Sequence, residues 1–462
     1  MIRPDWTAPL DAASDAAKRF LASLPDRAVG SSASLDSLRA ALGAPLPDES
    51  TDSAAVVRDL AAAVEPGLVA TPSGRFFGFV IGGAVPAAVA ADWLTSAWDQ
   101  NAGLYAVAPA ASVAEEVALG WITELLGLPA GVSGGFVTGG QMANYTGLLA
   151  ARHHVLDRAG WDVERRGLTG APPLRVLAGA ERHATIDRSL RYLGIGTDAI
   201  VPIAADDQGR MRPDELAAAL DGEVGPAIVC AQVGNINTGA CDDVGAICDA
   251  AHAHGAWVHV DGAFGLWAGV SPRLRPLVRG VERADSWATD CHKWLNVPYD
   301  SGLALCAHPE PHRRATGVRA SYLIHAERHE RDPLEWTPEF SRRARGFAVY
   351  AAIRALGRAG VRQIVERCCD LARRFAGRLG ADPRIEMLAD VTLNQVLFRL
   401  TDTAGGAQRT RELPARVQAD GTCWLSGTEW RGAPAVRISI SNWSTDEEDV
   451  DRSASAVLRC IG

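Results

Sequence analysis

Lys293 is the residue of this sequence with the most distinctive chemistry. Lysine and arginine together number 46, but only Lys18 and Lys293 are lysines, and the other 44 are arginines. A lysine amine can lose its proton and attack a carbonyl carbon to form a Schiff base, whereas an arginine guanidinium stays protonated. Lys18 falls in a polar N-terminal helix and serves as a comparison. Composition alone leaves two explanations for Lys293: it has a covalent role, or it is a lysine that remained by chance.

Further polar residues stand next to apolar runs. Asp261 directly follows the run 257–260, and His292 and Lys293 precede the run 302–306. A carboxylate at a strand end could meet a bound cation or a protonated ring, although turns and helix caps also use Asp. His183 stands at a predicted helix start and could lie flat over a planar ring, although a capping or core histidine is the commoner case.

Gly139 and Gly140 open another predicted helix. The free N–H groups and the dipole at a helix N-terminus favour a phosphate, although a glycine pair also marks a simple turn. Together with Lys293, Asp261 and His183, these glycines fit a planar, phosphorylated carbonyl compound that has a protonatable ring nitrogen. Pyridoxal 5′-phosphate has all of these parts.

The elements that must position these residues divide the chain into three parts. We expect an N-terminal helical arm (1–75), a large cofactor-binding domain (76–325), and a loop with a small C-terminal α+β domain (326–462). Apolar runs alternate with helical patterns in the large part, where candidate strands begin at Arg175, Ala227, Trp257 and Gly302. This alternation predicts an α/β fold with a mostly parallel central sheet, whose ligands bind at the carboxyl edge of the strands.

Composition and charge limit the class of protein. The chain is 47% hydrophobic and 22% charged, which is typical of globular proteins, and its net charge of −9 argues against a nucleic-acid partner. We expect no signal peptide and no membrane span. Nine scattered cysteines without a C-x-x-C pair favour a reducing cytoplasm. No metal site is expected, because His252, His254 and His259 lack a carboxylate at a fitting spacing.

Five ordered motifs resemble those of the pyridoxal-dependent group II amino-acid decarboxylases, the family of aromatic-amino-acid and glutamate decarboxylases. The segment Asp285-SWATDCHKWLNVPYDSG resembles the lysine signature of that family. The others are Phe76-FGF with Ala108-PAASVAEE, Val137-TGGQMAN, Gly234-NINTGACDD and His259-VDGAFG. The resemblance spans roughly residues 55–450. It implies an aspartate-aminotransferase-like (fold type I) structure, an amino-acid substrate, and a homodimer with the active site at its interface.

The resemblance also implies roles for individual residues. Lys293 would hold the cofactor as a Schiff base, and Asp261 would keep the ring nitrogen protonated so that the ring draws electrons from the breaking bond. His183 would stack on one face of the ring, and Ala263 would pack against the other. His292 sits beside the lysine and completes the catalytic set. The phosphate would be held by the glycine loop and by the segment before the lysine, namely Gly139, Gly140, Gln141, Asp290 and His292.

Two departures from the family pattern bear on the reaction. The family has G-T-T where this chain has Gly234-Asn235-Ile236, so Ile236 replaces a hydroxyl near the ring oxygen and Asn235 is the possible polar substitute. The family also carries a mobile loop whose tyrosine protonates the substrate carbon, but the segment 326–335 is shorter here and has no tyrosine. His325 or His329 could donate that proton instead, because imidazole titrates near neutral pH.

The sequence therefore predicts pyridoxal-phosphate-dependent decarboxylation of an amino acid. Loss of the tyrosine leaves two alternatives open: reaction with oxygen to give an aldehyde, or aldolase-like cleavage of the Cα–Cβ bond. A non-enzymatic binding protein is disfavoured, because Lys293 is retained. Arg437 could bind a substrate carboxylate or form a structural salt bridge. The expected substrate pocket contains Phe79, Val80, Ile81, His325 and Arg437. Its first three residues are apolar, so an apolar or aromatic amino acid is the expected substrate.

Overall fold

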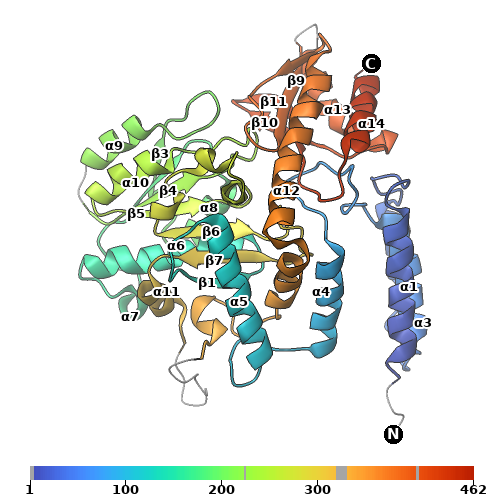
Figure 1. Cartoon of the computed structure of the whole chain (residues 1–462), viewed down its shortest axis with the longest axis horizontal. Helices are drawn as coiled ribbons and strands as arrows, with labels where there is room; N and C mark the ends of the chain where they lie inside the picture. The colour runs from blue at the N-terminus through green and yellow to red at the C-terminus, as the bar shows by residue number, and fades with distance from the viewer. Residues whose placement is uncertain (1–4, 223–224, 319–329, 402–404, 462) are drawn as a thin grey trace.

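A seven-stranded sheet forms the centre of the molecule in the computed structural model, which describes residues 5–222, 225–318, 330–401 and 405–461 (Figure 1). The strand order is β1-β7-β6-β5-β4-β2-β3. The strands from β6 to β3 in this row pair in parallel with one another, and β7 is antiparallel to both β1 and β6. The strands are Ser133–Val137 (β1), Arg175–Gly179 (β2), Ile200–Ile203 (β3), Ala227–Gln232 (β4), Trp257–Asp261 (β5), Ser286–Asp290 (β6) and Gly302–Cys306 (β7).

Helices cover both faces of this sheet. Helix α6 crosses one face and packs on β5, β6 and β7. In β4, Ile228 and Cys230 join the core beneath α6, whereas Val229 and Ala231 join the core on the opposite face. Burial on both faces explains why these strands are continuous apolar runs. The helices around the sheet are α4 (Pro86–Trp98), α5 (Pro109–Leu126), α6 (Gly140–Arg158), α7 (Val163–Arg166), α8 (Ala184–Tyr192), α9 (Pro213–Asp221), α10 (Val244–Ala253) and α11 (Pro309–Thr316). Short 3-10 helices occupy Glu65–Gly67 (η1), Gly265–Val270 (η2), Arg275–Val278 (η3), Val281–Arg283 (η4) and Pro333–Trp336 (η5).

A smaller antiparallel sheet lies near the C-terminus, with the order β10-β11-β9-β8. Helix α12 (Gly346–Gly380) runs from this sheet to α4 and α5 (Figure 1). Gly357 interrupts α12 with a φ of 59°, a backbone conformation that favours glycine. The remaining elements are β8 (Ile385–Met387), β9 (Gln395–Leu400), α13 (Gly406–Asp420), β10 (Ser426–Trp430), β11 (Ala433–Ser439) and α14 (Glu447–Cys460). The predicted α/β fold with a smaller C-terminal α+β unit is confirmed.

The N-terminal arm contains α1 (Thr7–Ser23), α2 (Leu35–Leu42) and α3 (Ser53–Val64), and it stands beside α4 (Figure 1). Ser34 and Asp52 cap α2 and α3 by accepting hydrogen bonds from backbone N–H groups, which fixes both helix starts. Helix α1 packs against α3 but has no buried residue. Within the described part of the chain, no helix is long and apolar enough to cross a membrane.

Candidate active site

The expected catalytic residues gather at the carboxyl edge of the large sheet. Asp261 ends β5 and Asp290 ends the neighbouring strand β6. Lys293 follows three residues after Asp290, and its Nζ lies 3.0 Å from Asp290 Oδ2. Both side chains are largely buried, with 16% of Lys293 and 3% of Asp290 exposed. An amine and a carboxylate therefore face each other where a parallel sheet binds its ligands.

The N-terminus of α6 meets the same carboxylate. A Cβ atom at Gly140 would lie 2.7 Å from Asp290 Oδ2, so glycine allows the helix to begin here. Asp290 Oδ1 is buried and has no hydrogen-bond partner among the described residues. Gln141 turns toward α8, where its Nε2 donates to Ser189 Oγ at 2.9 Å. The backbone N–H groups at the start of α6 therefore lie next to the carboxylate that pairs with the Lys293 amine.

Asp261 and His183 are joined through two neutral side chains. Asp261 accepts hydrogen bonds from Asn144 Nδ2 at 3.1 Å and from the backbone N–H of Ala263 at 3.3 Å. His183 caps α8, and its Nδ1 lies 2.8 Å from Thr185 Oγ1. Asn144 Nδ2 also donates to Thr185 Oγ1, at 3.0 Å. A carboxylate and an imidazole are therefore held by one shared amide.

Burial controls the charge of His183. Removal from water lowers the pKa of His183, because a buried imidazole favours its neutral form. The nearby Asp261 carboxylate opposes this effect, whereas Lys293 and Arg437 add to it. A neutral ring of this kind can lie against another planar ring without carrying a second positive charge into the site.

His292 is fixed next to the lysine. Its Nδ1 donates to the carbonyl oxygen of Ser301 at 2.9 Å, so this nitrogen carries the hydrogen. Burial lowers the pKa of His292 and favours the neutral ring, which leaves a lone pair on Nε2. The ring stacks on Tyr299 with 4.2 Å between centroids.

The side chain of Asn235 is engaged in its own turn. Its Oδ1 accepts from the backbone N–H groups of Asn237 and Thr238, and its Nδ2 donates to the carbonyl oxygen of Glu181. The turn holds Asn237 in place, and Asn237 Oδ1 lies 3.5 Å from Arg437 Nη1. Through these backbone contacts Asn235 stabilises the turn that holds Asn237 next to Arg437.

Arg437 lies on β11 and is only 6% exposed. Its Nε has no hydrogen-bond partner, and no carboxylate pairs with its guanidinium among the residues that the structure describes. Burial lowers the pKa of Arg437 to about 10. A buried cation without an anionic partner is unfavourable, and an incoming carboxylate would remove that penalty.

The apolar residues expected in the substrate pocket have different environments. Phe79 is 55% exposed and stacks on Trp424, with 5.7 Å between ring centroids. Val80 is buried in the main core, and Ile81 packs beside Trp424 in a smaller cluster. The next residue, Gly82, donates its N–H to the carbonyl oxygen of His292 at 3.1 Å. This segment therefore runs directly against the lysine loop. His325 and His329, the two histidines expected as proton donors, lie outside the described residues.

Comparison with known proteins identifies the family. The model of the pyridoxal-dependent decarboxylase conserved domain matches residues 36–401. The chain belongs to the pyridoxal-dependent decarboxylase family. Among its relatives is tryptophan decarboxylase 1 of Oryza sativa subsp. japonica, which is 30% identical over 87% of this chain and 83% of its own length. The aromatic-L-amino-acid decarboxylase of Bacillus atrophaeus is 28% identical over 92% of this chain and 89% of its own.

A solved structure of Oryza sativa TDC with pyridoxal phosphate and tryptamine matches this decarboxylase with a TM-score of 0.91 and 25% identity. The match covers 100% of this chain and 99% of the other. The predicted cofactor, pyridoxal 5′-phosphate, and the predicted carboxy-lyase activity on an amino acid are confirmed.

The side chains of the decarboxylase fit this cofactor. Lys293 offers an amine, Asp261 a carboxylate for a protonated ring nitrogen, and the start of α6 a set of N–H groups for a phosphate. Asp290 is the one residue whose charge does not suit the phosphate, because its carboxylate is negative and lies beside the helix end that would bind the phosphate.

Several residues of the decarboxylase site were not predicted. Asn144 lies inside the motif Val137-TGGQMAN, one turn beyond Gly140, so helical spacing could have indicated it. His259 precedes Asp261 by two residues, which places both side chains on one face of β5. Tyr299 lies inside the lysine signature segment, but its stacking on His292 could not be predicted, because that contact depends on the turn between β6 and β7.

Proposed function

We propose that this decarboxylase converts an aromatic L-amino acid into the corresponding amine and carbon dioxide. The observation that carries the proposal is the convergence of Lys293, Asp261 and Arg437 on His183, which supplies an amine, an acid and a carboxylate-binding cation in one site. The relatives named for tryptophan and for aromatic amino acids support the substrate class, because the chain spans more than four fifths of their length. The stacked pair Phe79 and Trp424 supports it further, since an aromatic side chain packs well beside aromatic rings.

Each side chain has a defined task in this proposal. Lys293 Nζ would bind the aldehyde carbon of the cofactor, and Asp261 would hold the proton on the ring nitrogen. When bound, pyridoxal phosphate supplies the ring that accepts the electron pair left on Cα as carbon dioxide departs. His183 would lie against one face of the ring, and Ala263 would face the other.

Other residues would hold the two anionic ends of the reactants. Gly139, Gly140 and Gln141 would place the N–H groups at the start of α6 around the phosphate, close to Asp290 and His292. Arg437 would pair with the substrate carboxylate, because it is buried and has no acidic partner in the described part of the chain. The pocket wall would contain Phe79, Val80, Ile81 and His325. Asn235 would act by supporting the turn next to Arg437.

Protonation of Cα after carbon dioxide leaves must use a group other than a tyrosine in the segment 326–335, which contains none. His292 Nε2 would take up a proton through its lone pair and pass it to Cα, because Nδ1 is engaged with Ser301. The missing tyrosine also favours a second outcome, in which oxygen and water react with the amino acid to give an aldehyde, ammonia, hydrogen peroxide and carbon dioxide.

A product assay tests the proposal. The holoenzyme is incubated with tryptophan, tyrosine, phenylalanine and, for comparison, glutamate, while carbon dioxide, amine, ammonia and peroxide are measured. Carbon dioxide with an equal amount of aromatic amine is the expected result. Equal amounts of ammonia and peroxide would show instead that the enzyme carries out the aldehyde-forming reaction. Turnover of an amino acid without carbon dioxide would indicate cleavage of the Cα–Cβ bond or another lyase reaction.

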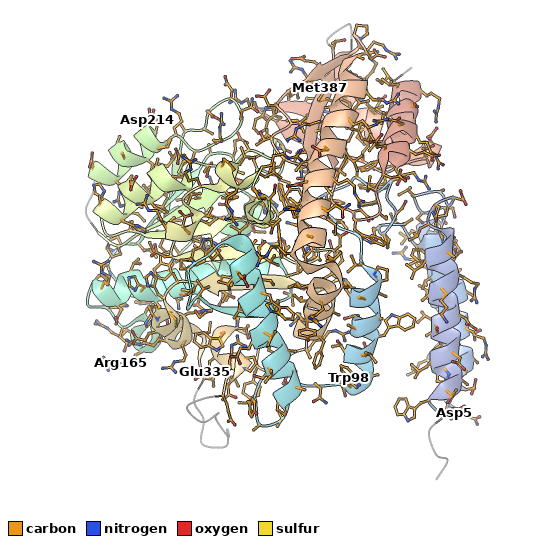
Figure 2. All side chains as sticks on the ribbon, viewed as in Figure 1. Asp5, Trp98, Arg165, Asp214, Glu335 and Met387 are labelled. Atoms are coloured by element: carbon orange, nitrogen blue, oxygen red, sulfur yellow. The ribbon has the colours of Figure 1, made fainter. Side chains whose placement is uncertain are left out.

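We also propose that the protein is a homodimer in the cytoplasm. The arm, residues 1–75, presents apolar side chains that the single chain leaves exposed, including 71% of Trp6 and 58% of Leu10. Helix α4 beside it ends at Trp98, which is 49% exposed (Figure 2). A second copy would cover these side chains. Unpaired cysteines, eight of them buried, support a reducing compartment. Sedimentation at micromolar concentration should give twice the mass of one chain.

A further inference from the structure

A chain of buried hydrogen bonds leads to the Asp261 carboxylate from behind. Trp257 Nε1 lies 2.9 Å from Ser286 Oγ, which lies 2.8 Å from His259 Nδ1. His259 Nε2 lies 2.9 Å from Asn144 Oδ1, and Asn144 Nδ2 lies 3.1 Å from Asp261 Oδ2. Each of the five side chains is at most 5% exposed. The chain joins β5, β6 and α6 beneath the site.

The direction of every donation is fixed. The Asp261 carboxylate only accepts, so Asn144 donates to it through Nδ2 and presents Oδ1 to His259 Nε2, which must therefore carry a hydrogen. Because the His259 ring is neutral, Nδ1 keeps a lone pair and accepts from the Ser286 hydroxyl, which in turn accepts from Trp257 Nε1. Burial lowers the pKa of His259 to about 3, so the ring is neutral and Nε2 carries its hydrogen. Nε2 donates to Asn144 Oδ1, which leaves the Asn144 amide hydrogens for Asp261. The reverse orientation of Asn144 would turn its carbonyl oxygen toward a carboxylate.

The second hydrogen of the Asn144 amide goes to the imidazole side of the site. Asn144 Nδ2 donates to Thr185 Oγ1 at 3.0 Å, and that hydroxyl lies 2.8 Å from His183 Nδ1. His183 Nδ1 also accepts from the backbone N–H of Thr185 at 3.3 Å, so it carries no hydrogen and the Thr185 hydroxyl donates to it. One amide thus orients both the acid and the stacking ring.

The fold makes room for His259 at a measurable cost. A Cβ atom at Gly147 would lie 2.5 Å from Cε1 of the His259 ring. Gly147 is inside α6, where glycine is less favourable than alanine. A core filled by apolar side chains would need neither the glycine nor the buried imidazole. Gly147 therefore provides the space beside α6 that the His259 ring occupies.

We propose that His259 and Asn144 are positioning residues that fix the Asp261 carboxylate and the His183 imidazole in the orientation that the pyridoxal ring requires. The inference rests on the roles proposed above for Asp261 and His183. A carboxylate held by an oriented donor does not have to give up rotational freedom when it meets the cofactor, so part of the cofactor affinity depends on this chain.

Three substitutions separate positioning from general packing. Asn144→Asp keeps the shape and still accepts from His259, but it replaces the donor that faces Asp261 with an acceptor. His259→Leu removes the bond to Asn144, whereas His259→Gln retains an N–H at a similar distance from the backbone. His312 provides the matched control: it is also buried, it lies 2.9 Å from the hydroxyl of Ser133, and it belongs to α11 outside the site.

The measurements are the dissociation constant for pyridoxal phosphate, from absorbance titration of the apoenzyme, and the apoenzyme melting temperature. We expect Asn144→Asp to raise the dissociation constant by about tenfold or more, which is the range for a hydrogen bond to a charged group. His259→Leu should raise it by about three- to tenfold, and His259→Gln should restore it to within about twofold. His312→Leu should lower the melting temperature and leave the dissociation constant within about twofold.

The inference is overturned if the dissociation constant follows the melting temperature through all variants, or if His259→Leu and His312→Leu bind the cofactor equally well. If Asn144→Asp yields no folded apoenzyme, the comparison of His259→Leu, His259→Gln and His312→Leu decides alone. Failure of the proposed aromatic-amino-acid activity would leave these binding constants unaffected, so the two proposals fail separately.

Discussion

Replacement of Arg437 by methionine should stabilise the apoenzyme and weaken substrate binding at the same time. Burial lowers the pKa of Arg437 from its ordinary value to about 10, and at ~1.4 kcal/mol per pKa unit this corresponds to about 3 kcal/mol for keeping the charge inside the protein. The guanidinium recovers little of this, because its contact with Asn237 is 3.5 Å long. At neutral pH, below the lowered pKa, Arg437 is charged and this penalty applies in full. Methionine has a similar shape and no charge.

The apoenzyme melting temperature should therefore rise for Arg437→Met by a few degrees, after part of that gain is lost to imperfect packing. The KM for the amino acid should rise by roughly tenfold to a hundredfold, because a charge-assisted pair with the substrate carboxylate is lost. Arg342→Met is the matched control. Arg342 is equally buried but pairs with Glu115 at 2.8 Å, so its removal should lower the melting temperature. If Arg437→Met also lowers the melting temperature and leaves KM unchanged, Arg437 is a structural residue and the reasoning is refuted.

Three more predictions concern the lysine, the acid beside it and the buried imidazoles. Lys293→Ala should abolish the visible absorbance of the bound cofactor and reduce turnover below detection, whereas Lys18→Ala, on the exposed arm, should change neither; a retained absorbance band would exclude Lys293 as the attachment site. Asp290→Asn removes an anion beside the start of α6 and should lower the dissociation constant for pyridoxal phosphate in an equilibrium titration, and a weaker complex would show that the carboxylate assists binding. Burial lowers the pKa of His259 to about 3 and of His312 to about 4, so both rings are neutral in the fold and gain protons mainly on unfolding. The apoenzyme should lose stability as the pH falls from about 6.5 toward 4, by up to ~1.4 kcal/mol per pH unit for each histidine, and His312→Gln should reduce the slope of pH-dependent melting curves by up to that contribution of one histidine.

The sequence predicted the elements whose local signals agree with their surroundings. Helix α2 spans Leu35–Leu42 within the predicted helical arm, because Ser34 caps it and its leucines recur at helical spacing. The strands at Arg175, Ala227, Trp257 and Gly302 also begin where the apolar runs begin. The sequence did not single out β1, Ser133–Val137, since two of its five residues are glycines and its strand geometry depends on pairing with β7.

The candidate site divides in the same way. Lys293, Asp261 and His183 could be predicted, because the sequence shows both the chemistry of their side chains and their positions relative to the predicted strands. The roles of Asn144 and His259 could not, since they depend on a hydrogen bond between residues that are 115 positions apart. The exposure of Phe79 likewise depends on how its segment passes the lysine loop, which no periodicity in the sequence describes.

The close approach of Gly147 and His259 also constrains how this chain can change over time. An alanine at position 147 is favoured by the helix itself, yet it meets the imidazole at 2.5 Å. The change becomes tolerable only after position 259 has acquired a smaller side chain, and that earlier change removes the donor to Asn144. The two positions are thus epistatic, and the order in which mutations arise decides whether a lineage can leave this arrangement. Random mutagenesis that samples one position at a time will find position 147 closed to alanine, although a paired library could repack both positions.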